Sequence, residues 1–380
     1  MFSSLLAPLL ETLRPHFSLS KSRLETLAIL LVGLANSRTV NLSHLASQFP
    51  GTSPHASKYR RLQRFFQHVR LDGDVAARLI VCMLDLRGPK LLALDRTNWK
   101  LGQSDVNILV LAVVTRRFRV PLMWVLLDHA GNSDTAQRIA LLRRYLALFG
   151  AGSVRALLAD REFIGAEWLE FLNDNNVPFV IRLKETMHIR LDDGSLRQFR
   201  SLLRKYRHGS WEGWLKGMQA TPGNRLRFAA KRIKGGELLI VASRGDCGAS
   251  ALNLYRKRWG IECLFADAKQ RGLNIEDTHI THPGKLATLL VVVALAVTWA
   301  YRCATRAMGR AAVPRKAHGR PAKSWFRIGL DALRNWIAHH PDLAINAWRQ
   351  TCPKKPFKRI ETKGVVYCEL RTNSPVNNPG

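Results

Sequence analysis

Four apolar runs decide the fold: LLALD (91–95), VNILVLAVV (106–114), VPLMWVLL (120–127) and SVRALLAD (153–160). All four are rich in aliphatic residues, and turn-like GQSD and TRRFR segments separate the first three, which is typical of β-strands. After the third run, DTAQRIALLRRYLALFG predicts a helix with Asp134 near its start and Gly150 at its end. FIGAEWLEFLNDNN predicts another helix and VPFVIRL (177–183) another strand. Three consecutive strands followed by alternating helices and strands predict a mixed α/β sheet.

Residues 1–88, which precede this sheet, are predicted to be helical. Leucines recur at helical spacing between positions 24 and 34, and two shorter helices follow, broken by Pro50, Gly51 and Pro54. The second short helix is basic, and its cations include Arg60, Arg61 and Arg64. A basic helix after a short helix and a turn could read DNA. The alternative is an amphipathic helix packed on the core through Phe65 and Phe66, and the net charge of the chain favours DNA contact.

Beyond residue 184 the composition indicates first a β-rich segment and then long helices. Residues 185–248 are rich in Gly and in short β-prone runs, which predicts a β-rich insertion, and a long helix is predicted from about 249 to 272. The run 286–301 has 16 residues without a charge, short of the roughly 20 that a membrane-spanning helix needs. A helix buried in a large soluble core explains this run better than membrane insertion does.

The charge balance points to an anionic partner. The 380 residues include 59 Lys and Arg against 28 Asp and Glu, a net charge of +31, while the 47% of apolar residues is ordinary for a folded protein. Phosphate neutralisation by Lys and Arg dominates nucleic-acid binding, so DNA or RNA is the first candidate and an anionic membrane surface the second. Residues 302–380 alone hold 16 cations and 4 acids, a net +12.

Cysteine spacing and the first residues indicate a reduced, cytoplasmic protein. The six cysteines form no Cys-x-x-Cys pair and no Cys/His cluster with zinc spacing. The segment MFSSLLAPLLETLRPHF has neither the basic region nor the long apolar region of a secretory signal.

Two predicted strands end in aspartate, at Asp95 and at Asp160. An Asp that closes a buried strand lies at the carboxyl edge of the sheet, where α/β proteins build their sites. Alone, each signal is weak, because an Asp in that place is also a common helix cap.

The predicted helix 249–272 carries a polar stripe. Tyr255, Arg258, Glu262 and Lys269 have offsets 0, 3, 7 and 14, so at 100° per residue they lie within about 60° of one another. A salt-bridged surface helix is the alternative reading of this stripe. Together with Asp95 and Asp160, however, Glu262 completes a carboxylate trio that could hold two hard cations about 3.5–4 Å apart for phosphoryl transfer on DNA. Arg258, Lys269 and Arg161, which follows Asp160 directly, could then grip phosphates.

These residues resemble a known family. Tyr255-x2-Arg258-x3-Glu262-x6-Lys269 matches the Tyr-Arg-Glu-Lys signature of the bacterial transposases of insertion-sequence family 4, and LALDRTNW around Asp95 and LLADREF around Asp160 resemble its two aspartate motifs. The resemblance covers residues 90–305. It implies a ribonuclease-H-like catalytic core with a β-rich insertion. It also implies that Asp95, Asp160 and Glu262 bind two Mg²⁺ ions, which Mn²⁺ can replace.

The resemblance further implies cut-and-paste movement of DNA. Hydrolysis frees a 3′-hydroxyl, this hydroxyl attacks the opposite strand to form a hairpin, the hairpin is opened, and the end is joined to target DNA. Tyr255, Arg258 and Lys269 would contact DNA near the cut, and the enzyme would act as a homodimer on two ends. Stacking on an aromatic side chain would hold a flipped base, and the candidates are Trp211, Trp214 and Trp259, although a Trp is more often part of the core.

The predicted organisation is therefore an α/β protein in three parts. Residues 1–88 form a helical N-terminal DNA-binding domain, 89–305 the ribonuclease-H-like catalytic domain with its insertion at 185–248, and 306–380 a helical basic C-terminal region. The competing functions are a plain nuclease with the same site, a catalytically inactive DNA-binding regulator or transposition inhibitor, and a membrane protein.

Overall fold

The computed structural model describes residues 2–349 except 102–103, 205, 234, 246, 248–249, 270 and 318, together with residues 355 and 357. Its core is one ten-stranded sheet with the order β3-β2-β1-β4-β5-β10-β9-β8-β6-β7. The strands of its first half are β1 (Lys90–Leu101), β2 (Ser104–Val114), β3 (Arg119–Leu127), β4 (Val154–Ala159) and β5 (Phe179–Leu183). All five strand predictions are confirmed in this half.

Strand directions fix the edge at which a site can form. β1 pairs antiparallel with β2, and β2 antiparallel with β3. β4 is parallel to both β1 and β5. The register places Leu94 opposite Ala159, so the next residue of each strand, Asp95 and Asp160, falls at the same edge. This order and these directions are consistent with a ribonuclease-H-like core.

The predicted β-rich insertion continues the same sheet. β10 pairs antiparallel with β5 and joins the two halves, which sequence alone did not indicate. The second half contains β6 (His188–Arg190), β7 (Leu196–Gln198), the short helix α8 (Phe199–Leu202), β8 (His208–Leu215), β9 (Leu226–Arg232) and β10 (Leu238–Arg244).

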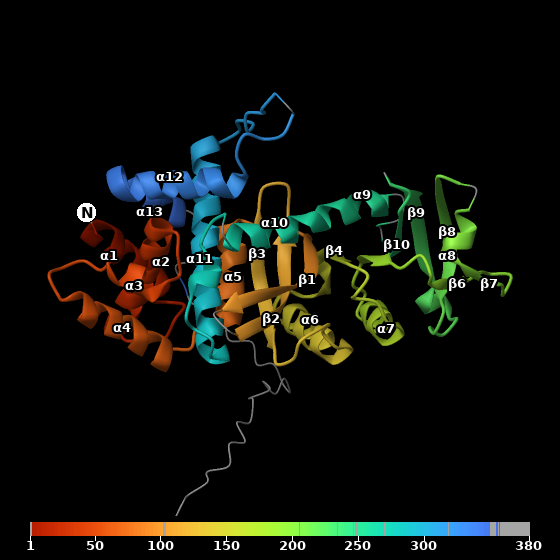
Figure 1. Cartoon of the computed structure of the whole chain (residues 1–380), viewed down its shortest axis with the longest axis horizontal. Coiled ribbons are helices and arrows are strands. Elements are labelled where there is room, and N and C mark those ends of the chain that lie inside the picture. Colours follow the sequence, from red (N-terminus) through yellow and green to blue (C-terminus); the bar gives the residue numbers. More distant parts are fainter. Residues whose placement is uncertain are drawn as a thin grey trace, which may run out of the picture.

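Helices lie on both sides of the sheet. α6 (Thr135–Phe149) and α7 (Ala166–Asp174) lie on one side in Figure 1, and α9 (Ala251–Tyr255) and α10 (Trp259–Ala268) cross the other. The predicted ends of α6 are confirmed: Asp134 and Gln137 form a reciprocal capping box, and Gly150 follows the helix with φ +73°.

The first 88 residues are helical, as predicted. The helices are α1 (Phe2–Leu13), α2 (Lys21–Ser37), α3 (Leu42–Ala46), α4 (His55–His68) and α5 (Gly73–Met83). α2, α4 and α5 pack against α11 (Pro283–Met308), and the apolar side chains of all five helices join the same hydrophobic core as the sheet. The proposed domain boundaries stay predictions.

α11 contains the uncharged run. By length and composition it is long and apolar enough to cross a membrane, but nearly all of its apolar stretch is buried among α2, α5, α12 (Trp325–His339) and β3. Such burial is typical of a core helix, which agrees with the prediction. α13 (Pro341–Arg349) packs against α1, α11 and α12. Most of the basic tail beyond residue 349 lies outside the described residues.

The prediction of one long helix over 249–272 is wrong. α9 ends at Tyr255, a 3₁₀ turn spans Arg256–Arg258, and α10 then runs only to Ala268. Lys269 already leaves the helical conformation, with ψ −141°. Gly272 packs directly against the backbone of Asp267 as the chain turns away.

Candidate functional site

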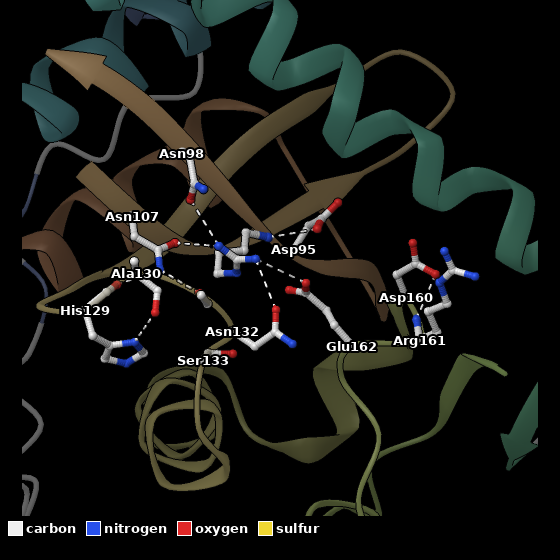
Figure 2. Close-up of polar contacts among 12 residues, drawn as sticks. Asp95, Asn98, Asn107, His129, Ala130, Asn132, Ser133, Asp160, Arg161 and Glu162 are labelled. Carbon is white, nitrogen blue, oxygen red and sulfur yellow. Dashed lines mark hydrogen bonds and ion pairs between the residues drawn. The ribbon is translucent and has the colours of Figure 1, made fainter. Parts of the chain in front are cut away.

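Asp95 and Asp160 occupy matching positions on neighbouring parallel strands, below the α9–α10 segment (Figure 2). In each case the backbone N–H of the following arginine, Arg96 or Arg161, donates to the carboxylate Oδ1 at 2.8 Å. These local bonds fix both carboxylates at the strand ends. The paired Asp-Arg sequences thus give the two positions the same local geometry.

Arg258 contacts both aspartates and also a third carboxylate, that of Glu262. Its Nη1 donates to Oδ2 of Asp95 at 2.7 Å, and its Nη2 donates to Oε1 of Glu262 at 2.5 Å. Nη2 also lies 3.7 Å from Oδ2 of Asp160. One guanidinium group therefore lies among the carboxylates of β1, β4 and α10. We call Asp95, Asp160, Glu262 and Arg258 the acidic cluster.

Tyr255 closes one side of the acidic cluster. Its hydroxyl donates to Oδ1 of Asp160 at 3.1 Å, and the Arg258 guanidinium carbon lies 5.8 Å from the centre of its ring. Burial raises the pKa of the Tyr255 phenol to about 12, so the group stays protonated and remains a donor. Thus Tyr255 holds Asp160 without adding negative charge.

Burial also controls the charge of Asp95. It raises the pKa of this carboxyl to about 6, and the nearby Arg258 opposes the rise. Burial alone would lower the pKa of Arg258, but Tyr255 and the three carboxylates raise it overall, so the guanidinium is always charged. The cluster therefore holds its negative charges only with a cation among them.

A network behind Asp95 was missed by sequence reasoning. The Arg96 side chain donates to Asn98, Asn107 and Asn132 at 3.0–3.2 Å and pairs with Glu162 at 3.4 Å. Asn107 in turn donates to the backbone oxygens of residues 129 and 131, part of the loop before α6 (Figure 2). The network ties β1, β2 and this loop together behind the cluster. The only sequence feature that pointed to Arg96 was the Asp-Arg pair at 95–96, which repeats at 160–161.

A basic cavity of about 580 Å³ lies beside Asp160. Its lining includes two glutamates and six cations: Arg161, Arg182, Lys184, Arg200, Arg204 and Arg232. Only Arg161 among these was singled out from sequence. The others lie in or next to β5, α8 and β9, which come together only in the folded protein. Arg161, which follows Asp160 in sequence, is the lining residue nearest in the chain to the acidic cluster.

The structure does not bring every predicted site residue together. Lys269 lies outside the acidic cluster, where its Nζ donates to the backbone oxygen of Asn98 and pairs with Glu276 at 3.0 Å. On α4, Arg60 and Arg64 are exposed, whereas Arg61 bonds Ser22, Thr26 and Glu25 on α2. Phe65 and Phe66 are buried, as the amphipathic alternative expects, and DNA contact by α4 stays a prediction.

The three candidate tryptophans differ in exposure. Trp259, at the start of α10 next to Arg258, is 63% exposed. Trp211 is partly buried and packs edge-on against Phe199, and the Trp214 indole donates to the backbone oxygen of Thr221 at 2.7 Å. Of the three, Trp259 has the ring face most open to a base.

A family model described as the transposase DDE domain matches residues 86–299, more than half of the chain. The chain belongs to the DDE transposase family. Curated proteins gave no match to it. The matched range begins just before β1, ends within α11, and includes all of the acidic cluster. Transposases act on DNA, which accounts for the net charge of +31.

Members of this family generally use divalent metal ions, and the donor chemistry of the acidic cluster fits them. Three carboxylates meet there, and carboxylate oxygens are the ligands that hard divalent cations prefer. Within the described part of the chain, however, no group of three His, Cys, Asp or Glu side chains has the spacing of a bound metal. The Arg258 guanidinium lies between Asp95 and Glu262 and bonds both.

Proposed function

We propose that this transposase excises and inserts an insertion sequence of family 4 by cut-and-paste chemistry, with Asp95, Asp160 and Glu262 as its catalytic carboxylates. The observation that carries the proposal is the convergence of these three side chains on Arg258, from two strand ends and one helix. The Tyr-Arg-Glu-Lys spacing supports the assignment to family 4.

Asp95, Asp160 and Glu262 would hold two Mg²⁺ ions, or Mn²⁺ in their place. Bound divalent ions lower the pKa of an attacking water or hydroxyl and stabilise the leaving oxygen of a phosphodiester. The chain's own groups position the carboxylates: the backbone N–H of Arg96 bonds Asp95, and the Tyr255 hydroxyl bonds Asp160. If cations were held there, Arg258 would have to release Asp95 and Glu262, and its guanidinium would then be available to a DNA phosphate.

The DNA path follows from the positions of exposed cations. The basic cavity with Arg161 would hold the phosphates of one strand beside Asp160, and Arg60 and Arg64 of α4 would contact the duplex farther from the cut. Trp259 would stack on a base displaced near the cut, because its ring is exposed next to Arg258. Lys269 would reach DNA only after leaving Glu276. A homodimer would bring two ends together for hairpin formation and strand transfer.

The test is a cleavage assay with purified protein, Mg²⁺ and DNA that carries the element's own ends. We expect free 3′-hydroxyl ends and DNA hairpins from the wild type, and neither product from Glu262→Gln. Glu167→Gln, which changes an exposed carboxylate on α7, is the matched control and should cleave normally. Both variants should still bind the ends.

Other outcomes favour the competing functions. Cleavage without hairpins or joined products indicates a plain nuclease with the same carboxylates. Binding of the ends without cleavage by the wild type indicates a catalytically inactive regulator. Wild-type cleavage rates in Glu262→Gln would refute the assignment of the acidic cluster.

A further inference from the structure

The segment between α11 and α12, residues 309–324, contains five cations, Arg310, Arg315, Lys316, Arg320 and Lys323, and no acidic residue. We call it the basic loop. Almost all of its described residues are exposed, and Figure 1 shows it rising beyond α11 and α12, clear of the sheet. A surface with one sign of charge that extends from the body is suited to contact with a polyanion.

The basic loop has a defined conformation. Arg315 and Pro321 form an antiparallel bridge, and the N–H of Lys316 donates to the oxygen of Arg320 at 2.9 Å. Gly319, with φ +78°, closes the turn by donating its N–H to the oxygen of Lys316 at 2.8 Å. Arg315 Nη1 donates to the Gly319 oxygen from the side. The cations therefore lie on a short β-ribbon that is held by hydrogen bonds within the loop.

The contacts of the loop's base place it on the α10 side of the sheet. The Arg117 guanidinium, from the turn between β2 and β3, lies 4.9 Å from the ring centre of Trp325, the first residue after the loop. Arg119, at the start of β3, packs against Gly260 of α10, so this turn and strand link the base of the loop to α10. Gly260 is two residues from Glu262. A duplex on the basic loop would therefore lie on the same side of the sheet as the acidic cluster.

The loop lacks neutral amide and hydroxyl side chains between its cations. Residues 309–323 contain no Asn, Gln, Ser or Thr, the neutral side chains that commonly read base edges. Small residues and prolines separate the cations. Arg and Lys can bind guanine edges as well as phosphates, but exposed cations without amide or hydroxyl neighbours favour phosphate contacts, which hold a duplex without selecting its sequence.

We propose that the basic loop binds duplex DNA through its phosphates and holds the target DNA during strand transfer. This rests on the proposed function, in which the ends have a constant sequence and the target varies from one event to the next. A contact without sequence preference suits the target. Lys323, which pairs with Asp331 of α12 at 2.9 Å, anchors the base of the loop, while Arg310 and Lys316 face the DNA.

Arg310→Gln with Lys316→Gln tests the proposal with little risk to the fold. Among the described residues, no hydrogen bond or ion pair engages these two side chains, so the ribbon keeps its own bonds. The matched control, Arg14→Gln with Arg155→Gln, removes the same charge from two exposed side chains, one after α1 and one at the start of β4. Light scattering checks that all proteins have the same oligomeric state.

The first measurement is the affinity for 40-base-pair duplexes of random, A·T-rich and G·C-rich sequence that lack the element's ends. We expect the loop variant to bind all three about tenfold more weakly at 0.1 M salt, with a dependence of log K on log salt shallower by about 2, since two phosphate contacts are lost. The control should match the wild type. Unchanged affinity and slope would refute a DNA contact, and a loss confined to one composition would show base reading instead.

The second measurement separates this proposal from the proposed function. With DNA carrying the element's ends, the loop variant should cleave at the wild-type rate but join pre-cleaved ends to a plasmid about tenfold more slowly. Equal loss in cleavage and joining, or a changed oligomeric state, would overturn the target role. The binding measurement needs no cleavage, so it decides the DNA contact even where the wild type fails to cut.

Discussion

Arg258 is the group whose removal should expose the electrostatics of the acidic cluster most directly. Arg258→Met keeps most of the side-chain volume and removes the cation that bonds Asp95 and Glu262 and lies near Asp160. At pH 8 three carboxylates then face one another without a positive charge among them. We expect the metal-free protein to lose stability for this reason.

The size of the loss follows from the burial of the partners. Removing one partner of a buried ion pair costs about 3–5 kcal/mol. Arg258 and Asp95 are well buried, with side chains 10% and 15% exposed, but Glu262 is 35% exposed, so solvent screens its share. We therefore expect a loss near the lower end, about 3 kcal/mol at pH 8. Arg227→Met, which breaks an exposed pair with Glu212, should cost less than about 0.5 kcal/mol.

The loss should depend on pH with a definite sign. Burial already raises the folded-state pKa of Asp95 to about 6, and without Arg258 it rises further. The repulsion is therefore absent below the unfolded pKa of about 4, where the carboxyl is protonated in both states, and grows as pH rises through the folded pKa. The difference in the free energy of unfolding between the Arg258→Met variant and the wild type should be small at pH 4 and largest at pH 8.

Thermal unfolding in chelator, and then in millimolar Mg²⁺, measures both effects. In the variant a divalent cation can supply the missing charge without displacing a guanidinium, so Mg²⁺ should raise the unfolding midpoint of the variant more than that of the wild type. A variant as stable as the wild type in chelator would refute the electrostatic reasoning. Equal Mg²⁺ effects on the two proteins would refute the competition between Arg258 and the cation.

Three further predictions concern other groups. Burial raises the pKa of Asp267 to about 6, so its ionisation costs stability above that pH; Asp267→Asn should stabilise the fold by about 2 kcal/mol at pH 8 and not at pH 4, measured by denaturant unfolding. A Cβ on Gly329 would lie 1.9 Å from the oxygen of Ala300, so Gly329→Ala should separate α12 from α11 and cost about 3 kcal/mol, whereas Gly152→Ala, with open space around it, should be nearly neutral. Trp259→Ala should slow cleavage of end-bearing DNA about tenfold with little loss of affinity, because base stacking contributes about 1–3 kcal/mol; an unchanged rate would contradict its stacking role.

The parts of the fold that could be predicted are those with a local signal. β1 to β5 are apolar runs between turn segments, and α6 carries its own caps, so their positions follow from nearby residues. The proximity of Asp95 and Asp160 also follows, because each ends a strand and parallel neighbours end at one edge. The burial of α11 was predictable from the short length of its uncharged run.

What could not be predicted depends on contacts between distant segments. The β5–β10 pairing that makes one ten-stranded sheet, and the cavity that gathers Arg161 with Arg200 and Arg232, exist only after β-strands from both halves meet. The break between α9 and α10 is a similar case. Periodicity continues through Tyr255, Arg258 and Glu262, so the pattern alone gives no sign of the 3₁₀ turn.

The guanidinium geometry explains why an arginine, rather than a lysine, suits the centre of the acidic cluster. Nη1 and Nη2 point to different carboxylates, one on β1 and one on α10, and Nη2 also faces β4. A planar fork can make these contacts together, whereas a lysine ammonium is a single point charge on a flexible stem. Arg258 therefore links the strand edge to the helix before any DNA is bound. The same fork matches the oxygens of a phosphate, so the residue that stabilises the cluster without metal is suited to bind DNA once cations neutralise the carboxylates.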